Sequence, residues 1–258
     1  MINYSLEKYR KYDYQDICAH ADGFKLPVNV YLPTLTNENN SCAVVCIHGG
    51  AWTSDLKKDS DWSGSWMKHT ASLLASLGYI GIEITHRSIT AVDMSDILSD
   101  IQCAFTYVNG VLKDRHDIKN VYAIGDSAGG HLALMSAFFE CAELRPSKVV
   151  ACNPVSDLTD PKWQLNRTSE HDRKRFSPLY FSDKTNTDIF IMHGDADKTV
   201  ELSCSIKLNE HLSDLGCHSS LEVLSAAVHA FILYGYRTPI DHVNAYIEKV
   251  ISFFASGN

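Results

Sequence analysis

The chain has 258 residues, a formal net charge of −8 at pH 7 and 45% hydrophobic residues. This length suits one α/β domain that buries its own core. The negative charge disfavours binding to nucleic acid or to an anionic membrane surface, and no lysine-rich run offsets it locally. We therefore expect a single domain over residues 1–258 that binds neither.

Extended segments are expected first, near residues 13–20 and 26–32, as an antiparallel start of the fold. Further along the chain, the spacing of the apolar residues predicts strands and helices that alternate. Strands are predicted at residues 43–47, 79–84, 120–124, 148–152, 189–192 and 221–224. Helices are predicted at residues 66–77, 92–112, directly after Ser127, 200–212 and 240–254. This alternation predicts an α/β fold with a mostly parallel sheet, helices on both faces, and ligands at the carboxyl ends of the strands.

The alternation breaks between Pro154 and Asp188. This stretch is highly charged, yet Trp163, Phe176 and Tyr180 could anchor it. An excursion of this length inside a compact domain is typically a lid or an ordered insertion. We therefore expect a small cap over residues 154–188; the alternative is a solvated surface loop.

The N-terminal residues MINYSLEKYRK lack the apolar core of a secretion signal, and no stretch is long enough to span a bilayer, which favours a cytoplasmic location. The eight cysteines form no C-x-x-C pair and fall mostly in apolar segments, so reduced, buried thiols are expected.

The histidines lack H-x-x-x-H or H-E-x-x-H spacing, so no zinc site is predicted.

Residues 123–134 read AIGDSAGGHLAL and contain a G-x-S-x-G pentapeptide between a strand pattern and a helix pattern. A serine is a good nucleophile only when a tight turn presents it to a base and to oxyanion donors. Gly125 and Gly129 leave room for such a turn, because a Cβ at either position would crowd strand against helix. Ser127 is therefore the candidate nucleophile, with a glycine-rich structural turn as the alternative.

Candidate partners follow Ser127 in the chain. HGDADKTV starts at His193 after one predicted strand, and His229 lies in AVHAF just past another. Serine, acid, histidine is the chain order of the α/β-hydrolase triad. Upstream, CIHGGAW ends at Trp52, and its glycines can turn N–H groups toward a substrate carbonyl oxygen.

The motifs HGGAW, GDSAGGHLA, HGxxD and VHAF resemble those of the α/β-hydrolase esterases, in particular the hormone-sensitive-lipase-like group and the feruloyl esterase, acetyl esterase and kynurenine formamidase relatives. The resemblance spans roughly residues 25–255. The sequence departs from the family at Ala51, where HGGG has its third glycine, and at ITHRSIT, which keeps Arg87 of the usual DYRLAPE but not its tyrosine.

The resemblance implies a serine esterase that needs no metal or organic cofactor and binds a small-molecule ester. His229 would be the base and Asp197 the acid, since H-G-x-x-D places Asp197 rather than Asp195 at the acid position. The oxyanion hole would be formed by N–H groups of Gly49, Gly50 and Ala128. The substrate class would be short-chain or aromatic carboxylic esters, for example acetyl or feruloyl esters of carbohydrates. No oligomeric state follows from these motifs.

Other residues near the motifs can be explained by structural roles. His48 and His193 each precede a tight glycine turn, and we expect both to orient loop backbone. Trp52 is weighed equally as a substrate-binding side chain and as packing support. Asp126 could tune Ser127, but an exposed or salt-bridged residue with a structural role is expected instead, and His131 is expected to have no catalytic role.

Two other functions use the same scaffold. A kynurenine formamidase would apply the same residues to an N-formyl amide, and HGG-x-W occurs in that group. A non-enzymatic binding protein is the third reading, because fold does not fix function; the intact serine, acid, histidine and glycines argue against it.

Overall fold

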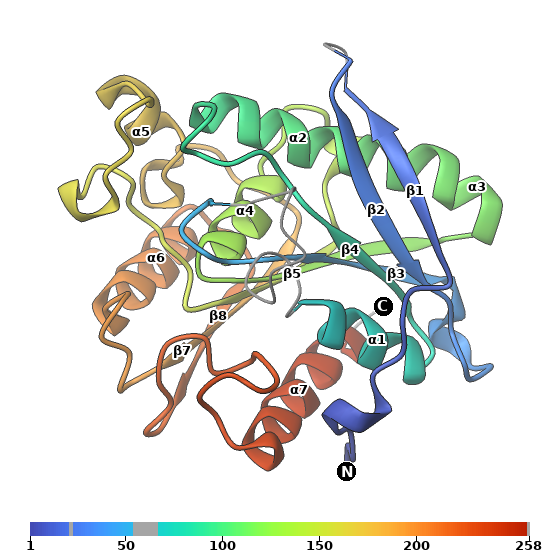
Figure 1. Cartoon of the computed structure of the whole chain (residues 1–258). Coiled ribbons are helices and arrows are strands. Elements are labelled where there is room, and N and C mark those ends of the chain that lie inside the picture. Colours follow the sequence, from blue (N-terminus) through green and yellow to red (C-terminus); the bar gives the residue numbers. More distant parts are fainter. Residues whose placement is uncertain (21–22, 54–66, 257–258) are drawn as a thin grey trace.

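The computed structural model describes residues 1–20, 23–53 and 67–256. An eight-stranded sheet runs through its centre in the order β1-β2-β4-β3-β5-β6-β7-β8 (Figure 1). Its strands are β1 (Tyr14–Ala19), β2 (Lys25–Tyr31), β3 (Cys42–Ile47), β4 (Ile80–Ile84), β5 (Asn120–Asp126), β6 (Lys148–Cys152), β7 (Asp188–Gly194) and β8 (Ser219–Leu224). β2 pairs antiparallel with β1 and β4, and every pairing from β4 to β8 is parallel. The predicted α/β class is confirmed.

Helices cover both faces of the sheet (Figure 1). Residues Val44 and Cys46 of β3 pack in one core with α1 (Met67–Ser76) and α7 (Ile240–Ala255). The alternate residues Val45 and Ile47 pack in a second core with α2 (Met94–Tyr107), α4 (Ala128–Ser136) and α6 (Leu202–Asp214). Because both faces are covered, β3 is buried along its whole length, as parallel strands commonly are.

One predicted helix differs from the observed structure, and the predicted start of another lies outside the described residues. The helix expected over residues 92–112 is α2 followed by a π-helical turn, η3 (Val108–Leu112), and by α3 (Lys113–His116), which ends where Asp117 adopts φ 51°. The helix expected over residues 66–77 corresponds to α1 (Met67–Ser76), and its expected first residue, Trp66, lies outside the described residues. The remaining short helices are η1 (Leu6–Lys8), η2 (Glu38–Ser41) and η4 (Ala142–Leu144).

Residues 154–188, where the sequence predicts a cap, contain several short helices and some buried apolar side chains. They contain the short helices η5 (Pro161–Trp163), α5 (Glu170–Arg175) and η6 (Pro178–Tyr180) before β7 begins. Leu158, Leu165 and Phe176 are buried in the same core as α2 and α4. The segment is thereby fixed against the helical layer beside the carboxyl ends of the strands (Figure 1).

The carboxyl ends of four parallel strands carry the residues singled out by sequence. Gly49 and Gly50 follow β3, Ser127 follows β5, Asp197 follows β7 and His229 follows β8. Within residues 1–20, 23–53 and 67–256, no helix has the length and apolar composition needed to cross a bilayer. All eight cysteines are free thiols.

Candidate active site

Ser127 lies in a strained turn between β5 and α4, with φ 56° and ψ −118°, a conformation that side-chain-bearing residues rarely adopt. A Cβ at Gly125 would lie 2.1 Å from the carbonyl oxygen of Gly129, and one at Gly129 would lie 2.1 Å from that of Ile47. The turn therefore exists only because both glycines lack side chains, as predicted. It holds Ser127 at the carboxyl edge of the sheet.

Ser127, His229 and Asp197 lie in one hydrogen-bonded line. Nδ1 of His229 is 2.7 Å from Oδ2 of Asp197, and Nε2 of His229 is 3.0 Å from Oγ of Ser127. Since a carboxylate only accepts, Nδ1 carries the proton. Nε2 is then free to accept the hydroxyl proton of Ser127. The structure brings together the three side chains that the motifs singled out.

Asp197 is held by groups that favour its ionised form. Its Oδ1 accepts the backbone N–H groups of Thr199 at 2.7 Å and Val200 at 3.0 Å. Burial raises the pKa of the Asp197 carboxyl, but hydrogen bonds from His193 and His229 outweigh it, so that this pKa lies well below its usual range. Asp197 is therefore an anion at neutral pH.

The pKa of His229 moves in the opposite direction. Burial lowers it, but the hydrogen bond to Asp197 and the nearby carboxyl of Asp126 together raise the pKa above the ordinary histidine value. The imidazolium form that His229 would take during proton transfer is thus stabilised by its surroundings.

A glycine also brings the Asp197 loop and the His229 loop together. A Cβ at Gly194 would lie 2.1 Å from the carbonyl oxygen of Ala227. Asp195 is exposed, and its Oδ1 accepts the N–H of Ala226 at 2.6 Å. Ala226 lies in the loop of His229, so this hydrogen bond joins the two loops.

The candidate oxyanion donors lie beside the serine. A Cβ at Gly49 would lie 3.3 Å from Cβ of Ser127, and Gly50 has φ 98°. The carbonyl of Gly50 is fixed by the backbone N–H of Thr53 at 2.9 Å. Ala128 begins α4, where first-turn N–H groups have no acceptor within the helix.

His48 and His193 hold loop backbone, as expected. Nδ1 of His48 donates to the carbonyl of Gly49 at 2.8 Å, while Nε2 of His193 donates to the carbonyl of Val200 at 2.9 Å. Neither ring hydrogen-bonds Ser127. His48 also stacks on buried His86, with ring centroids 4.6 Å apart.

Trp52 is buried and does not line the pocket, which favours packing support over substrate binding. Its side chain has no exposed surface, and its Nε1–H donates to Nδ1 of His131 at 3.1 Å. It meets the indole of Trp163 edge-on at 5.8 Å. The structure therefore corrects the assignment of Trp52 to substrate binding: it supports Trp163, which faces the pocket.

Asp126 is the site residue whose environment differs from the sequence expectation. It is 2% exposed, and no hydrogen-bond partner among the described residues meets its Oδ1. Burial raises the pKa of this carboxyl to about 7. The expectation of an exposed or salt-bridged residue was wrong: β5 is buried without interruption from Val121 through Asp126. The apolar run directly before Asp126 is the sequence signal that could have indicated this burial.

The pocket above Ser127 has a cavity volume of about 300 Å³, at the small end for ligand sites. Its walls combine the catalytic candidates, the β3 loop, and a set of larger side chains from the helices and loops around it. These larger residues are Met67, Trp163, Leu233, Tyr236 and Arg237.

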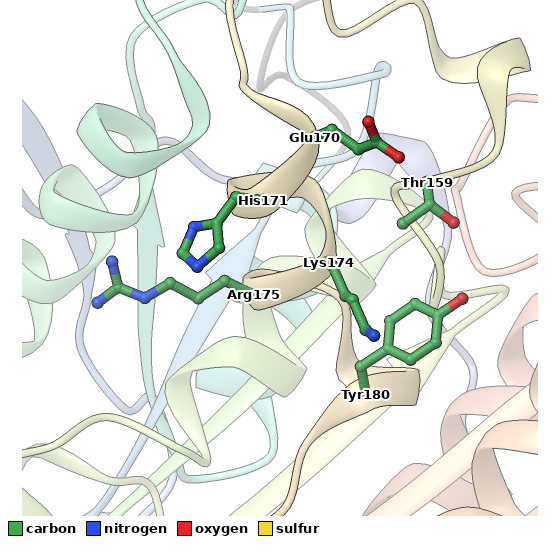
Figure 2. A pocket seen from close by; sticks show the side chains of 6 residues that line it. All are labelled: Thr159, Glu170, His171, Lys174, Arg175 and Tyr180. Carbon is green, nitrogen blue, oxygen red and sulfur yellow. The ribbon is translucent and has the colours of Figure 1, made fainter.

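A second hollow lies on the outer surface of the 154–188 insertion (Figure 2). It is lined by Thr159, Glu170, His171, Lys174, Arg175 and Tyr180. Lys174 and Tyr180 lie on one side of α5, and His171 and Arg175 point to the other (Figure 2). None of these side chains belongs to the Ser127 pocket.

Across the described part of the chain, no three His, Cys, Asp or Glu side chains gather in a way that could hold a metal.

Solved structures share this fold. The native esterase Est2 of the Planctomycetes species Thermogutta terrifontis superposes with a TM-score of 0.76 at 22% identity, covering 98% of this chain and 94% of that one. Its propionate-bound form gives a TM-score of 0.76 at 21% identity and covers 100% of both chains. At this identity the likeness establishes the α/β-hydrolase fold.

Curated relatives match part of the chain. A non-reducing polyketide synthase of Penicillium brasilianum, prhL, is 30% identical over 161 residues, which is 57% of this chain. The synthase mapC of Penicillium roqueforti is 28% identical over the same length. The chain spans 6% of the length of each synthase.

Two family models match, and they overlap. The model BD-FAE matches residues 28–157, and the model of the prolyl oligopeptidase family matches residues 96–256. Together they extend over all the motifs and all four strand ends that form the site. The resemblance to α/β-hydrolase esterases is thereby confirmed. The chain belongs to the BD-FAE and prolyl oligopeptidase families, and so to the serine hydrolases of the α/β-hydrolase fold.

Proposed function

We propose that the protein is a serine carboxylesterase that hydrolyses short-chain or aromatic carboxylic esters through an acyl-enzyme. The observation that carries the proposal is the line from Asp197 through His229 to Ser127, with distances of 2.7 and 3.0 Å. The protonated Nδ1 faces the carboxylate, which leaves Nε2 as the base. No other group is needed to activate the serine.

In the first half of the reaction, Oγ of Ser127 attacks the ester carbonyl carbon and passes its proton to Nε2 of His229. The carbonyl oxygen becomes an oxyanion, which N–H groups of Gly49, Gly50 and Ala128 would stabilise. The intermediate collapses, its bond to the alcohol oxygen breaks, and His229 gives its proton to the departing alcohol. Asp197 stabilises the imidazolium throughout.

In the second half, water attacks the acyl-enzyme carbonyl and gives a proton to His229. Collapse of the second intermediate returns that proton to Oγ of Ser127 and releases the acid. The small pocket with Trp163 and Tyr236 in its wall supports short or aromatic groups, and acetyl or feruloyl esters of carbohydrates are the proposed natural class.

Hydrolysis of 4-nitrophenyl acetate by wild type, Ser127→Ala and His229→Ala tests this function. Each variant should lose about four to six decades of kcat, because the residues act as a unit. Activity in either variant above a tenth of wild type would overturn the assignment. N-formylkynurenine assayed beside the ester separates esterase from formamidase: faster turnover of the formamide would identify the second activity.

A further inference from the structure

Arg237 adds a positive charge to the wall of the Ser127 pocket. Of the described residues that line this pocket, it is the one lysine or arginine. Its guanidinium makes no ion pair or hydrogen bond with any described residue. Arg237 is exposed, so water hydrates its guanidinium in the free protein, and an anionic ligand group could replace that water with bidentate hydrogen bonds.

The guanidinium is held in place by its neighbour. Its Cζ lies 4.8 Å from the centroid of the Tyr236 ring, and Tyr236 also lines the pocket. Stacking on an aromatic ring covers one face of the guanidinium plane and leaves the N–H groups at its edge available. The side chain is thereby partly ordered before a ligand arrives, which reduces the entropy cost of binding.

The loop that carries Arg237 is fixed to the core. Tyr234 is 1% exposed, and its hydroxyl donates to Oδ1 of Asn244 at 2.7 Å. Gly235 then has φ 77°, a turn that glycine permits, and the chain emerges so that Tyr236 and Arg237 reach the pocket. His229 and Arg237 lie in the same segment between β8 and α7, and both line the pocket.

The negative charge around Arg237 bears on which substrates the pocket can bind. The chain has a formal net charge of −8, Asp126 lines the pocket, and the carboxylate of Asp197 lies behind His229. An anionic substrate would be repelled by this field unless a cation lay beside the reacting bond. A neutral substrate needs no such residue.

We propose that Arg237 selects esters that carry a carboxylate on the acyl or the alcohol group, with the guanidinium edge binding that carboxylate while Ser127 attacks the ester. This inference rests on the proposed esterase function and narrows its substrate class. Arg237 is a specificity residue and takes no part in proton transfer.

Two matched substrate pairs test the proposal. The mono-4-nitrophenyl ester of glutaric acid against 4-nitrophenyl valerate tests a carboxylate on the acyl group, and 3-acetoxybenzoate against phenyl acetate tests one on the alcohol. The readout is the ratio of kcat/KM for the anionic and neutral member of each pair. In Arg237→Gln the ratio should fall about tenfold in at least one pair, the size expected for loss of a charge-assisted hydrogen bond. Arg237→Lys should lose less, because the charge remains.

Lys119→Gln is the matched control, since it removes one exposed positive charge just before β5, at the opposite end of the strand from Ser127. Its ratios should equal those of wild type. Unchanged ratios in Arg237→Gln, or an equal fall in Lys119→Gln, would overturn the proposal. Absence of Ser127-dependent hydrolysis of the neutral esters would instead refute the esterase function, so the two failures are distinguishable.

Discussion

The indole N–H of Trp52 donates a hydrogen bond to Nδ1 of His131 across 3.1 Å, and neither side chain has any exposed surface. Because Trp52 can only donate, Nδ1 of His131 is unprotonated and Nε2 carries the proton. Nε2 then donates to the carbonyl oxygen of Phe176 at 2.7 Å. One neutral imidazole thus joins the β3 loop, α4 and the 154–188 insertion.

Removal of the acceptor should destabilise the fold. His131→Leu leaves a buried indole N–H unpaired, so we expect the free energy of unfolding to fall by about 1–3 kcal/mol. Urea denaturation of His131→Leu, Trp52→Phe and the double variant measures the coupling between them. Fully additive effects of the two single substitutions would contradict the hydrogen bond as a source of stability.

The same pair predicts how stability depends on pH. Burial lowers the pKa of His131 to about 4. The unfolded chain binds this proton near the ordinary histidine value, about 6.5, whereas the folded protein binds it only near 4. Stability from His131 is therefore complete above pH 6.5 and is lost as the pH falls toward 4. The difference in melting temperature between wild type and His131→Leu should shrink over this range; a constant difference would contradict the argument.

The activity should depend on the protonation of His229. Its pKa is raised by Asp197 and Asp126, so kcat/KM should fall on acidification with a midpoint above the ordinary histidine value, about 6.5. Asp126→Asn removes one of these carboxyls and should move the midpoint to lower pH. A flat profile between pH 5 and 8 would argue against a histidine base, and an unmoved midpoint in Asp126→Asn against its influence.

Asp195 and Asp197 should differ in their effect on turnover. Asp197→Asn can no longer hold His229 with its proton on Nδ1, and kcat should fall by roughly three to four decades. Asp195→Asn keeps an oxygen that can accept the N–H of Ala226, so it should cost less than about tenfold. Steady-state kinetics of both variants measures the ranking; the reverse order would reassign the acid.

Trp163 and Phe176, which the sequence treated alike as cap residues, should respond differently to truncation. Trp163 lines the pocket, so Trp163→Ala should change KM and acyl-chain preference more than the melting temperature. Phe176 is 8% exposed and part of the core, so Phe176→Ala should cost about 3–5 kcal/mol of stability. Equal stability loss with unchanged preference in both variants would mean that the insertion does not contribute to substrate selection.

Much of this site could be predicted from sequence because its residues lie directly after strands. Apolar periodicity located those strands, and parallel pairing places their carboxyl ends at one edge. Gly125 and Gly129 indicated the close approach of strand and helix through their missing side chains alone. For these residues, local pattern and chain order were enough.

The rest depends on contacts between distant segments. Whether Trp52 faces the pocket or the core is decided by His131, 79 residues further on, and by Trp163 in the insertion. The bond from Asp195 to Ala226 joins two loops that no sequence period relates. The end of α2 is likewise set by a π-helical turn at Val108, where the apolar spacing continues unchanged.

The activation of Ser127 by His229 is tested most directly by covalent labelling of the intact enzyme with a fluorophosphonate, followed by mass spectrometry. The wild-type protein should gain one label, and the labelled peptide should contain Ser127. Ser127→Ala should gain none, and His229→Ala should react far more slowly, since the hydroxyl has lost the base 3.0 Å away. Labelling of Ser127→Ala at the wild-type rate, or equal rates for wild type and His229→Ala, would contradict the proposed mechanism.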